Sequence, residues 1–471
     1  MLLRYFYDQK LAHASYLVGC QATGEALVMD PGRDIDPYVE VAESQGMRIV
    51  AVTETHIHAD LLSGARELAE RTGAQLFLSD EGDADWKYQY HHNYDHHLVK
   101  DGDIFKIGNI KFKVLHTPGH TPEHISFIIT DTAGANKPMG IFTGDFVFVG
   151  DVGRPDLLEA AAGIKGTAEP GARRMFHSLQ RFKALPDYMQ VWPAHGAGSA
   201  CGKALGAIPS STVGYEKLFN WAMNYTDEDA FVQALLSGQP EPPRYFAMMK
   251  KLNKEGPKVL HSAPMPEQLP FTHLADLLAQ GAMLVDTRST DAFAAAHIPG
   301  TINIPFDNSF TTWSGWLLNY ETPYYLIVDA HLLTDVVRAL RSIGLDNVLG
   351  YSETSAISAW PKSGRHLQSY EVVTPKQAAD KVLNGEMFVL DVRNSSEWAE
   401  GHLPGANHIM LGYLSARFTE VPTDRPILVQ CRSGGRSAIG ASLLQSKGVP
   451  QVINLLGGFR EWAAEGLPIE R

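Results

Sequence analysis

The chain contains an internal duplication, and this duplication limits its C-terminal part to two copies of one fold. The stretch LVDTRSTDAFAAAHIPGTINIP at 284–305 matches VLDVRNSSEWAEGHLPGANHIM at 389–410 almost position for position, with Asp286 and Asp391 105 residues apart. Both copies combine short apolar runs, typical of buried parallel strands, with segments typical of crossover helices. The repeat therefore predicts two α/β domains, each with a parallel central sheet.

Changes in composition mark the domain boundaries. Gly and Pro residues interrupt both helix and strand periods at 252–270 and again at 361–375, which predicts linkers there. Before the first linker, strand-like runs end in polar loops, and a helical tail begins near residue 214. A chain of 471 residues is long enough for three domains. The predicted domains are 1–255, which includes the helical tail, 266–362 and 371–471.

Charge and cysteine content narrow the function classes. The formal net charge is −13, from 40 basic and 53 acidic residues, which argues against binding of nucleic acid or anionic membranes. Three cysteines cannot form a disulfide framework and indicate a reducing compartment. The sequence begins without the pattern of a secretory leader, and no stretch approaches about 18 uninterrupted apolar residues. We therefore expect a cytoplasmic protein that spans no membrane.

Histidine- or aspartate-bearing motifs follow predicted strands at four places in the N-terminal part. These motifs are THIHAD (55–60), HTPGHT (116–121), TGD (143–145) and PAHG (193–196). Short loops at strand ends can direct several side chains at one point. Neutral imidazole and carboxylate together suit zinc or iron, so the motifs predict one shared metal site.

The order of these motifs resembles that of the metallo-β-lactamase superfamily, whose fold is an αββα sandwich. Dinuclear hydrolases of the superfamily carry H-x-H-x-D-H, and here Leu61 replaces the last histidine. The resemblance implies that the second metal position keeps Asp60 and His195 but loses one ligand, which favours a mononuclear site. The residues implied for the first position are His56, His58, His120 and Asp145.

Within the superfamily, TGDFVFVGDVGRPD (143–156) looks most like the persulfide dioxygenases. Those enzymes use one Fe(II) per chain, held by two histidines and one aspartate. The resemblance assigns these roles to His56, His120 and Asp145, a facial triad that leaves positions open for dioxygen and a sulfur ligand. His58 is then either a fourth ligand or a residue that orients the ligands.

Further candidates lie near the expected metal site, and each has two interpretations. His116 either forms hydrogen bonds within its loop or takes part in pocket chemistry. Arg154 either holds an anionic substrate group or forms a structural ion pair. His195 is expected to face the metal pocket together with Asp60. Cys201 is either a buried inert thiol or a thiol that relays sulfane sulfur.

The last domain carries an activated-cysteine loop. The strand ILVQ (427–430) leads into CRSGGR, which places Cys431 at a strand end before a predicted helix. The loop resembles that of rhodanese, and its C-x₄-R spacing is one residue shorter than the phosphatase loop. Backbone N–H groups and arginine charges in such a loop favour a thiolate and stabilise a persulfide. The residues with these expected roles are Cys431, Arg432 and Arg436 as catalytic residues, and Ser433, Gly434 and Gly435 as backbone donors.

The middle domain resembles a rhodanese that has lost its nucleophile. Aligning LIVDA with ILVQC puts Ala330 at the position of Cys431, in a loop that is three residues shorter and lacks both arginines. We therefore expect no covalent sulfur transfer there. The remaining roles for this domain are spacing, docking or oligomerisation.

Taken together, the domain order resembles the bacterial persulfide dioxygenase–rhodanese fusions of sulfide detoxification. The resemblance implies oxidation of a low-molecular-weight persulfide by dioxygen to sulfite, followed by sulfur transfer to sulfite that gives thiosulfate. It also makes a homo-oligomer plausible. The alternative is a zinc-dependent thioester hydrolase of the glyoxalase II type fused to a sulfurtransferase. An intact Cys431 loop and metal triad argue against a non-enzymatic sensor.

Overall fold

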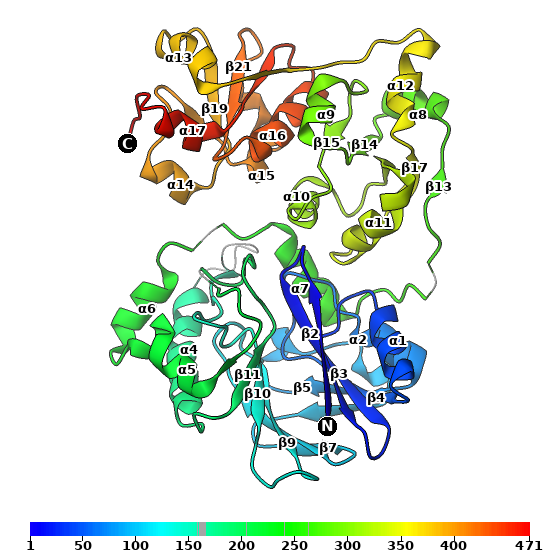
Figure 1. Cartoon of the computed structure of the whole chain (residues 1–471), viewed down its shortest axis with the longest axis vertical. Coiled ribbons are helices and arrows are strands. Elements are labelled where there is room, and N and C mark those ends of the chain that lie inside the picture. The colour runs from blue at the N-terminus through cyan, green and yellow to red at the C-terminus, as the bar shows by residue number, and fades with distance from the viewer. Residues whose placement is uncertain (158, 160–165, 204, 240, 262) are drawn as a thin grey trace. The chain divides into compact units, whose positions relative to one another are not determined.

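The computed structural model describes residues 1–157, 159, 166–203, 205–239, 241–261 and 263–471 (Figure 1). These residues form two compact units. The first comprises Met1–Ala263 with the short segment Arg341–Gly344, and the second comprises Pro264–Leu340 with Leu345–Arg471. Among the described residues, no helix is long and apolar enough to cross a membrane.

The first unit contains two six-stranded sheets whose strands follow one another in sequence order. The strands of the first sheet are β1 (Leu2–Asp8), β2 (His13–Cys20), β3 (Glu25–Met29), β4 (Arg48–Thr53), β5 (Gln75–Ser79) and β6 (His96–Val99). Those of the second are β7 (Ile104–Ile107), β8 (Ile110–His116), β9 (Ile125–Asp131), β10 (Gly140–Gly144), β11 (Gln190–Pro193) and β12 (Ser211–Thr212). In each sheet antiparallel strands adjoin a parallel part, which comprises β3 to β6 in the first and β10 with β11 in the second.

The two sheets pack face to face, and helices cover their outer faces (Figure 1). Apolar side chains of both sheets, such as Val18 and Phe127, share one buried cluster. A second cluster joins the first sheet to the helices beside it, and a third joins the second sheet to its own helices. This arrangement is the expected αββα sandwich. The helices of the unit are α1 (Asp36–Ser44), α2 (Ala65–Thr72), α4 (Ala168–Lys183), α5 (Val213–Phe219), α6 (Glu228–Leu236) and α7 (Tyr245–Glu255).

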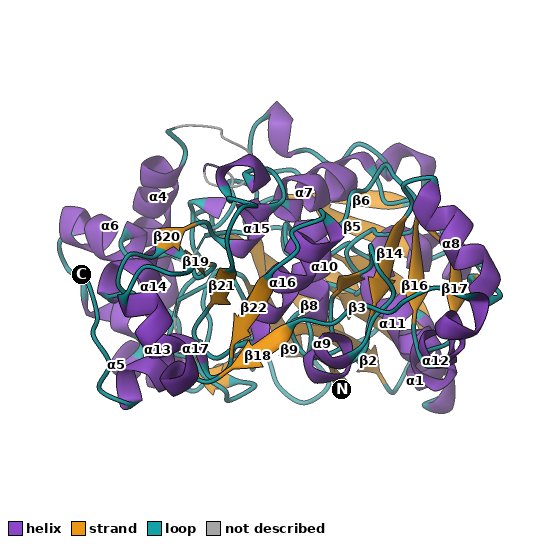
Figure 2. Ribbon diagram, turned by 90° about the horizontal axis from the view of Figure 1, so that it is seen from above, coloured by secondary structure: helices purple, strands orange, loops and turns teal. Residues whose placement is uncertain are grey.

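The second unit contains two five-stranded parallel sheets with the same strand order. Figure 2 shows strands of both sheets in orange. The first has the order β13 (Glu267–Gln268), β17 (Val348–Ser352), β16 (Tyr324–Ile327), β14 (Met283–Asp286) and β15 (Ile302–Asn303). The second has the order β18 (Glu371–Val373), β22 (Val452–Leu455), β21 (Ile427–Gln430), β19 (Phe388–Asp391) and β20 (Asn407–His408). Each strand has its counterpart in the other sheet, so the α/β duplication predicted from the sequence is confirmed.

Helices connect the strands of both repeats, as parallel sheets require. Those of the middle repeat are α8 (Phe271–Ala279), α9 (Thr290–Ala295), α10 (Phe310–Leu317), α11 (Leu333–Arg341) and α12 (Ser355–Ala359). Those of the last repeat are α13 (Pro375–Leu383), α14 (Ser395–Glu400), α15 (Leu411–Leu414), α16 (Gly435–Ser446) and α17 (Gly458–Ala464).

The strand register corrects one sequence alignment between the repeats. Asp286 pairs with Ile327, whereas the equivalent Asp391 pairs with Gln430. The residue that follows each strand is therefore Val328 in the middle repeat and Cys431 in the last, so Val328 rather than Ala330 occupies the cysteine position. The alignment of apolar runs was wrong by two residues because hydrogen-bonded pairing, not the extent of the apolar run, sets the register. The middle repeat still lacks a thiol at this position.

A buried ion pair holds the D-x-R segment of the last repeat. The Arg393 guanidinium donates to both oxygens of Asp391, with distances of 2.7 to 3.0 Å, and to the Gly401 carbonyl at 2.7 Å. The exposed fraction of Arg393 is 2%, and its guanidinium lies 4.2 Å from the centroid of the Phe459 ring. Arg288 makes the same contacts with Asp286 and with the Ala296 carbonyl in the middle repeat. This pair is therefore part of the fold rather than of one repeat's chemistry.

The substitution Arg393→Met is expected to destabilise the last domain by about 3–5 kcal/mol, because it leaves Asp391 buried and uncompensated. Thermal unfolding of the full chain, followed by circular dichroism, would show this as a lowered transition temperature. Arg417→Met is the matched control, since its ion pair with Glu420 is exposed and we expect no measurable shift. Equal stability of the two variants would contradict a structural role for the buried pair.

Candidate functional site

Three of the predicted metal ligands come together at the ends of the strands in the first unit. Nε2 of His120 lies 3.4 Å from Oδ2 of Asp145, and Nε2 of His56 lies 3.8 Å from the same oxygen. All three side chains are buried. With metal–ligand bonds of about 2.1 Å, ligand atoms roughly 3–4 Å apart can share one ion. The set His56, His120 and Asp145 therefore has the spacing of a two-histidine, one-carboxylate site.

Several potential ligand atoms of this centre have no hydrogen-bond partner within the described structure. Nε2 of His56 and both carboxylate oxygens of Asp145 are buried and have no hydrogen-bond partner among the described residues. Burial of such atoms without a partner costs free energy, and a cation removes that cost. Imidazole nitrogen and carboxylate oxygen fit both iron and zinc, so the donor set supports a metal without identifying it.

A second group of potential ligands lies against the first. Nε2 of His195 lies 3.2 Å from Oδ2 of Asp60 and 3.4 Å from Oδ1 of Asp145, and the thiol of Cys201 lies in the same group. Although burial alone would lower it, the carboxylates of Asp145 and Asp60 raise the pKa of His195 to about 9. Burial raises the pKa of the Cys201 thiol, and the same two carboxylates raise it further. Asp60, His195 and Cys201 therefore face the metal centre.

His58 lies beside the centre but belongs to a separate group. Its Nε2 lies 3.2 Å from Asp30 Oδ1 and 3.3 Å from Glu54 Oε2. Burial opposes the protonated ring, but these two carboxylates raise the pKa of His58 well above its usual value. Its Nδ1 lies 4.0 Å from Asp60 Oδ1 and has no hydrogen-bond partner in the described part of the chain. His58 thus remains available either to orient Asp60 or to bind a metal through Nδ1.

Hydrogen bonds behind the ligands fix their orientation. Nδ1 of His120 donates to the Arg154 carbonyl at 2.9 Å. The backbone N–H of Asp145 donates to Nε2 of His124 at 3.1 Å, and the His124 ring stacks on that of His56. Such contacts select one ring tautomer and one side-chain direction.

The structure favours one interpretation for each of two further candidates. Nε2 of His116 bonds to the Pro122 carbonyl at 2.9 Å, which is the hydrogen-bonding role within the loop. The Arg154 guanidinium is buried and donates twice to Asp156, at 2.6 and 2.8 Å, which is the structural ion pair. These contacts engage both side chains away from the metal centre.

Glu123 supports the loop that carries His56 and His58, and no sequence motif indicates this role. Its Oε1 accepts the N–H of Ile57, between the two histidines of the H-x-H motif, at 2.8 Å. Burial raises the pKa of Glu123 to about 7. The backbone that carries His56 and His58 is therefore held by a carboxyl group that titrates near neutrality.

In the second unit, Cys431 lies between the end of β21 and the start of α16. Its Sγ accepts the N–H of Gly434 at 3.1 Å, and the hydroxyl of Ser437 lies 3.4 Å from it. Gly434 has a φ of +104°, a conformation that favours glycine. A Cβ on Gly458 would lie 2.2 Å from the Cys431 carbonyl oxygen, so only glycine fits there. The backbone thus encloses the thiol tightly.

The two arginines of the loop differ in their surroundings. Arg436 makes a bidentate ion pair with Glu397, at 2.6 and 2.8 Å, whereas Arg432 is exposed. Glu397 also closes the capping box at the N-terminus of α14. The N-S-S-E pattern reveals that cap from sequence, but nothing in it indicates contact with Arg436, 39 residues away.

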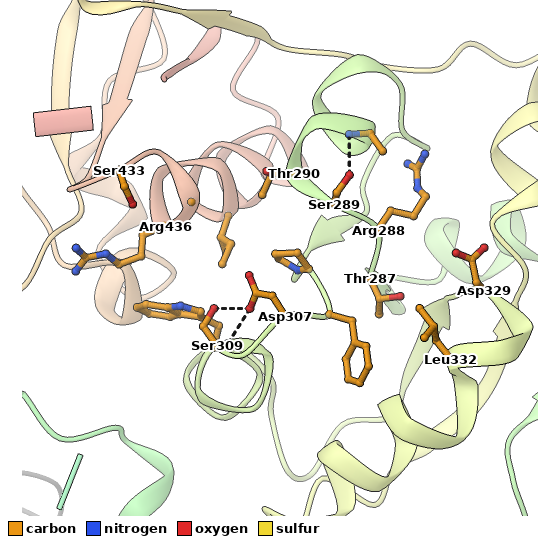
Figure 3. A pocket seen from close by; sticks show the side chains of 16 residues that line it. Thr287, Arg288, Ser289, Thr290, Asp307, Ser309, Asp329, Leu332, Ser433 and Arg436 are labelled. Carbon is orange, nitrogen blue, oxygen red and sulfur yellow. Dashed lines mark hydrogen bonds between the residues drawn. The ribbon is translucent and has the colours of Figure 1, made fainter. Parts of the chain in front are cut away.

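A pocket of about 860 Å³ opens beside this loop, inside the second unit (Figure 3). Ser433 and Arg436 lie on one side of it, and Asp329 and Leu332 of the middle repeat lie on the other. Most of its lining comes from the middle repeat, and Gly435 and Ile439 complete the part from the last repeat. The backbone N–H of Asn303 in β15 donates to the Ser442 hydroxyl in α16 at 2.9 Å, which joins the two repeats. The middle repeat therefore forms a wall beside the Cys431 loop.

Comparison with known families accounts for most of the chain. The model of the metallo-β-lactamase superfamily matches residues 9–195, and that of the rhodanese-like domain matches residues 271–352 and 374–465. These ranges contain both candidate centres.

Individual relatives agree with this assignment. A solved structure, a metallo-β-lactamase from Staphylococcus aureus subsp. aureus COL, is 46% identical with a TM-score of 0.68, and the alignment covers 75% of this chain and 99% of that one. The persulfide dioxygenase ETHE1 of Bos taurus is 26% identical over 41% of this chain and 68% of its own length. A hydroxyacylglutathione hydrolase of Rhodospirillum rubrum is 32% identical over 38% of this chain and 60% of its own length. The chain spans about half the length of the curated relatives that it matches first. It belongs to the metallo-β-lactamase superfamily and carries two rhodanese-like domains after its metallo-β-lactamase domain.

Proposed function

We propose that this protein is an Fe(II)-dependent persulfide dioxygenase whose last domain is a thiosulfate-forming sulfurtransferase. In the first reaction a low-molecular-weight persulfide, RSSH, reacts with O₂ and water to give the thiol RSH and sulfite. In the second, the sulfane sulfur of another persulfide passes to sulfite, which gives RSH and thiosulfate. The Fe(II) requirement, the substrate and the coupling of the two reactions all belong to this proposal.

The main support for the dioxygenase reaction is a difference between the two groups of potential ligands at the metal-binding centre. His56, His120 and Asp145 form a two-histidine, one-carboxylate set for one ion, whereas the second group offers the carboxylate of Asp60, the imidazole of His195 and the thiol of Cys201, with Leu61 in place of another histidine. A bridging hydroxide between two metals, as a hydrolase would use, is harder to hold when one position lacks that histidine. A mononuclear facial triad with open positions suits dioxygen chemistry better.

When iron is bound, it supplies the redox chemistry and the positions at which dioxygen and sulfur meet. The chain's own residues provide the rest. His56, His120 and Asp145 would hold the ion, and the Arg154 carbonyl keeps the His120 ring in the tautomer that leaves Nε2 free. The buried surroundings exclude bulk water from a reactive sulfur species.

The second half depends on the Cys431 loop. The thiolate of Cys431 attacks the outer sulfur of a persulfide, so an S–S bond forms on Cys431 while the original S–S bond breaks and the thiol leaves. The N–H of Gly434, directed at Sγ, stabilises negative charge on sulfur. Sulfite then attacks the same outer sulfur, releasing thiosulfate and regenerating the thiolate.

The pocket beside this loop gives the middle repeat a role in the proposal. Residues of that repeat form the surface opposite Ser433 and Arg436. A persulfide or sulfite that approaches the loop through this pocket is therefore confined by the inactive repeat. Confinement of this kind lowers the entropic cost of aligning the reactants.

The substitution Cys431→Ser is expected to lower sulfur transfer by at least about 1,000-fold, because it removes the nucleophile. Oxygen uptake with a persulfide should be retained, and the product should change from thiosulfate to sulfite. Cys20→Ser is the control, since Cys20 is a buried thiol in β2. Loss of oxygen uptake in the Cys431 variant alone would contradict two separate centres.

The substitution His120→Ala is expected to lower oxygen uptake by more than about 100-fold, because it removes an iron ligand. Bound iron, measured by mass spectrometry of the purified protein, should fall in parallel. Transfer of sulfur from thiosulfate to cyanide, which depends on Cys431, should remain at the wild-type level. If this transfer were lost as well, the two centres could not be independent.

The zinc hydrolase alternative predicts a different metal content, since Asp60 and His195 could still help to hold a second ion. After anaerobic purification we expect one iron per chain, together with oxygen uptake on glutathione persulfide. Two zinc ions per chain, with hydrolysis of a glutathione thioester and no oxygen uptake, would replace the proposal with that alternative.

A further inference from the structure

A buried histidine outside the recognised motifs faces the metal centre. His13 is the first residue of β2, and its exposed fraction is 3%. Its Nε2 is buried and has no hydrogen-bond partner among the residues that the structure describes. A polar atom buried in this way usually has a partner, and none of the described residues supplies one here.

The ring of His13 lies beside the group that contains Asp60 and His195. Its centroid is 5.6 Å from that of His195 and 5.7 Å from that of His58. An imidazole carries an N–H that it can donate in either of its protonation states.

The backbone holds His13 in this place together with His195. Ala12 has a φ of +49°, which is strained for a residue with a Cβ. Its carbonyl accepts the N–H of Gly196 at 3.1 Å and Nδ1 of His195 at 3.0 Å, while the N–H of Ala14 donates to the Ala194 carbonyl at 2.6 Å. These bonds compensate for the strain, and the turn that orients His195 therefore also directs His13.

His13 is not placed as a metal ligand. Within the described structure it belongs to none of the three groups whose ligand atoms lie close enough to share an ion. Those groups contain the facial triad and the nearby carboxylates of Asp60, Asp30 and Glu54. The unpartnered Nε2 is therefore available to a molecule bound next to His195 and His58.

We propose that His13 binds the sulfur substrate of the metal centre by donating its N–H to an anionic thiolate or persulfide. This inference rests on the proposed function, because it assigns a residue to the substrate of that reaction. An anion at this position also meets the carboxylates of Asp60 and Asp145, which repel it. An N–H donated by His13 offsets part of this repulsion, because a hydrogen bond to an ionised acceptor is stronger than one between neutral groups.

The test measures thiol binding separately from turnover. The full chain is loaded with Co(II) in place of the native metal and titrated with glutathione, and the visible absorption of cobalt reports the Kd. In His13→Phe the Kd should rise roughly 10- to 100-fold, because a hydrogen bond to a charged group is lost. His13→Gln keeps an N–H donor, so its Kd should lie close to the wild-type value. His177→Phe, an exposed position on α4, should bind as the wild type does.

Cobalt content must be equal in all variants for the inference to stand. Loss of cobalt in His13→Phe would make His13 a ligand and overturn the inference, as would an unchanged Kd in that variant. Should the Phe variant fail to fold, His13→Asn replaces it. The Asn amide is shorter and should bind glutathione more weakly than Gln does, and equal Kd values for the two would overturn the inference. A wild-type protein that binds glutathione but takes up no oxygen with any persulfide would refute the dioxygenase proposal alone.

Discussion

The metal centre depends on one arrangement, in which the protein engages one nitrogen of each imidazole and leaves the other free. Backbone carbonyls of Arg154 and Ala12 hold Nδ1 of His120 and His195, and Asp30 with Glu54 engages Nε2 of His58. The free nitrogens then converge on the carboxylates of Asp145 and Asp60. Fixed tautomers and directions of this kind organise the ligands before an ion arrives, so the cost of ordering them falls on folding and not on binding.

Much of this centre could be predicted from sequence because its ligands directly follow strands. The motifs that contain His56, His120 and Asp145 stand at strand ends, where a sheet brings distant segments together. The functional placement of His13 was not predicted, because this residue begins the strand-like segment HASYLVGC and no motif surrounds it. The pairing of Glu397 with Arg436 also escaped, since the helical cap explains that glutamate locally. Linear patterns show what a residue does for its own element but not which partner it meets across the fold.

The duplicated half shows that fold and chemistry are set by different residues. Both repeats keep the D-x-R ion pair and the same strand order, which position their loops alike. Only one places a thiol after its central strand, because Val328 stands where Cys431 would be. The sequence could reveal the duplication and the missing nucleophile, but the two-residue shift between the repeats required the hydrogen-bonded register. The repeat without the thiol keeps the same scaffold, and its residues form part of the pocket beside the Cys431 loop.

The bonds from Ala12 to His195 and Gly196 have a consequence for the order of events during folding. They join segments more than 180 residues apart in the chain, and the ligands themselves are spread from His56 to His195. Contacts of such long range form late, because the intervening chain must first be brought together. The emerging chain contains His56, His120 and Asp145 once residue 145 has been synthesised, but the bonds from Ala12 cannot form before residue 196. The turn that orients His195 is therefore completed only after all three residues of the facial triad have been made.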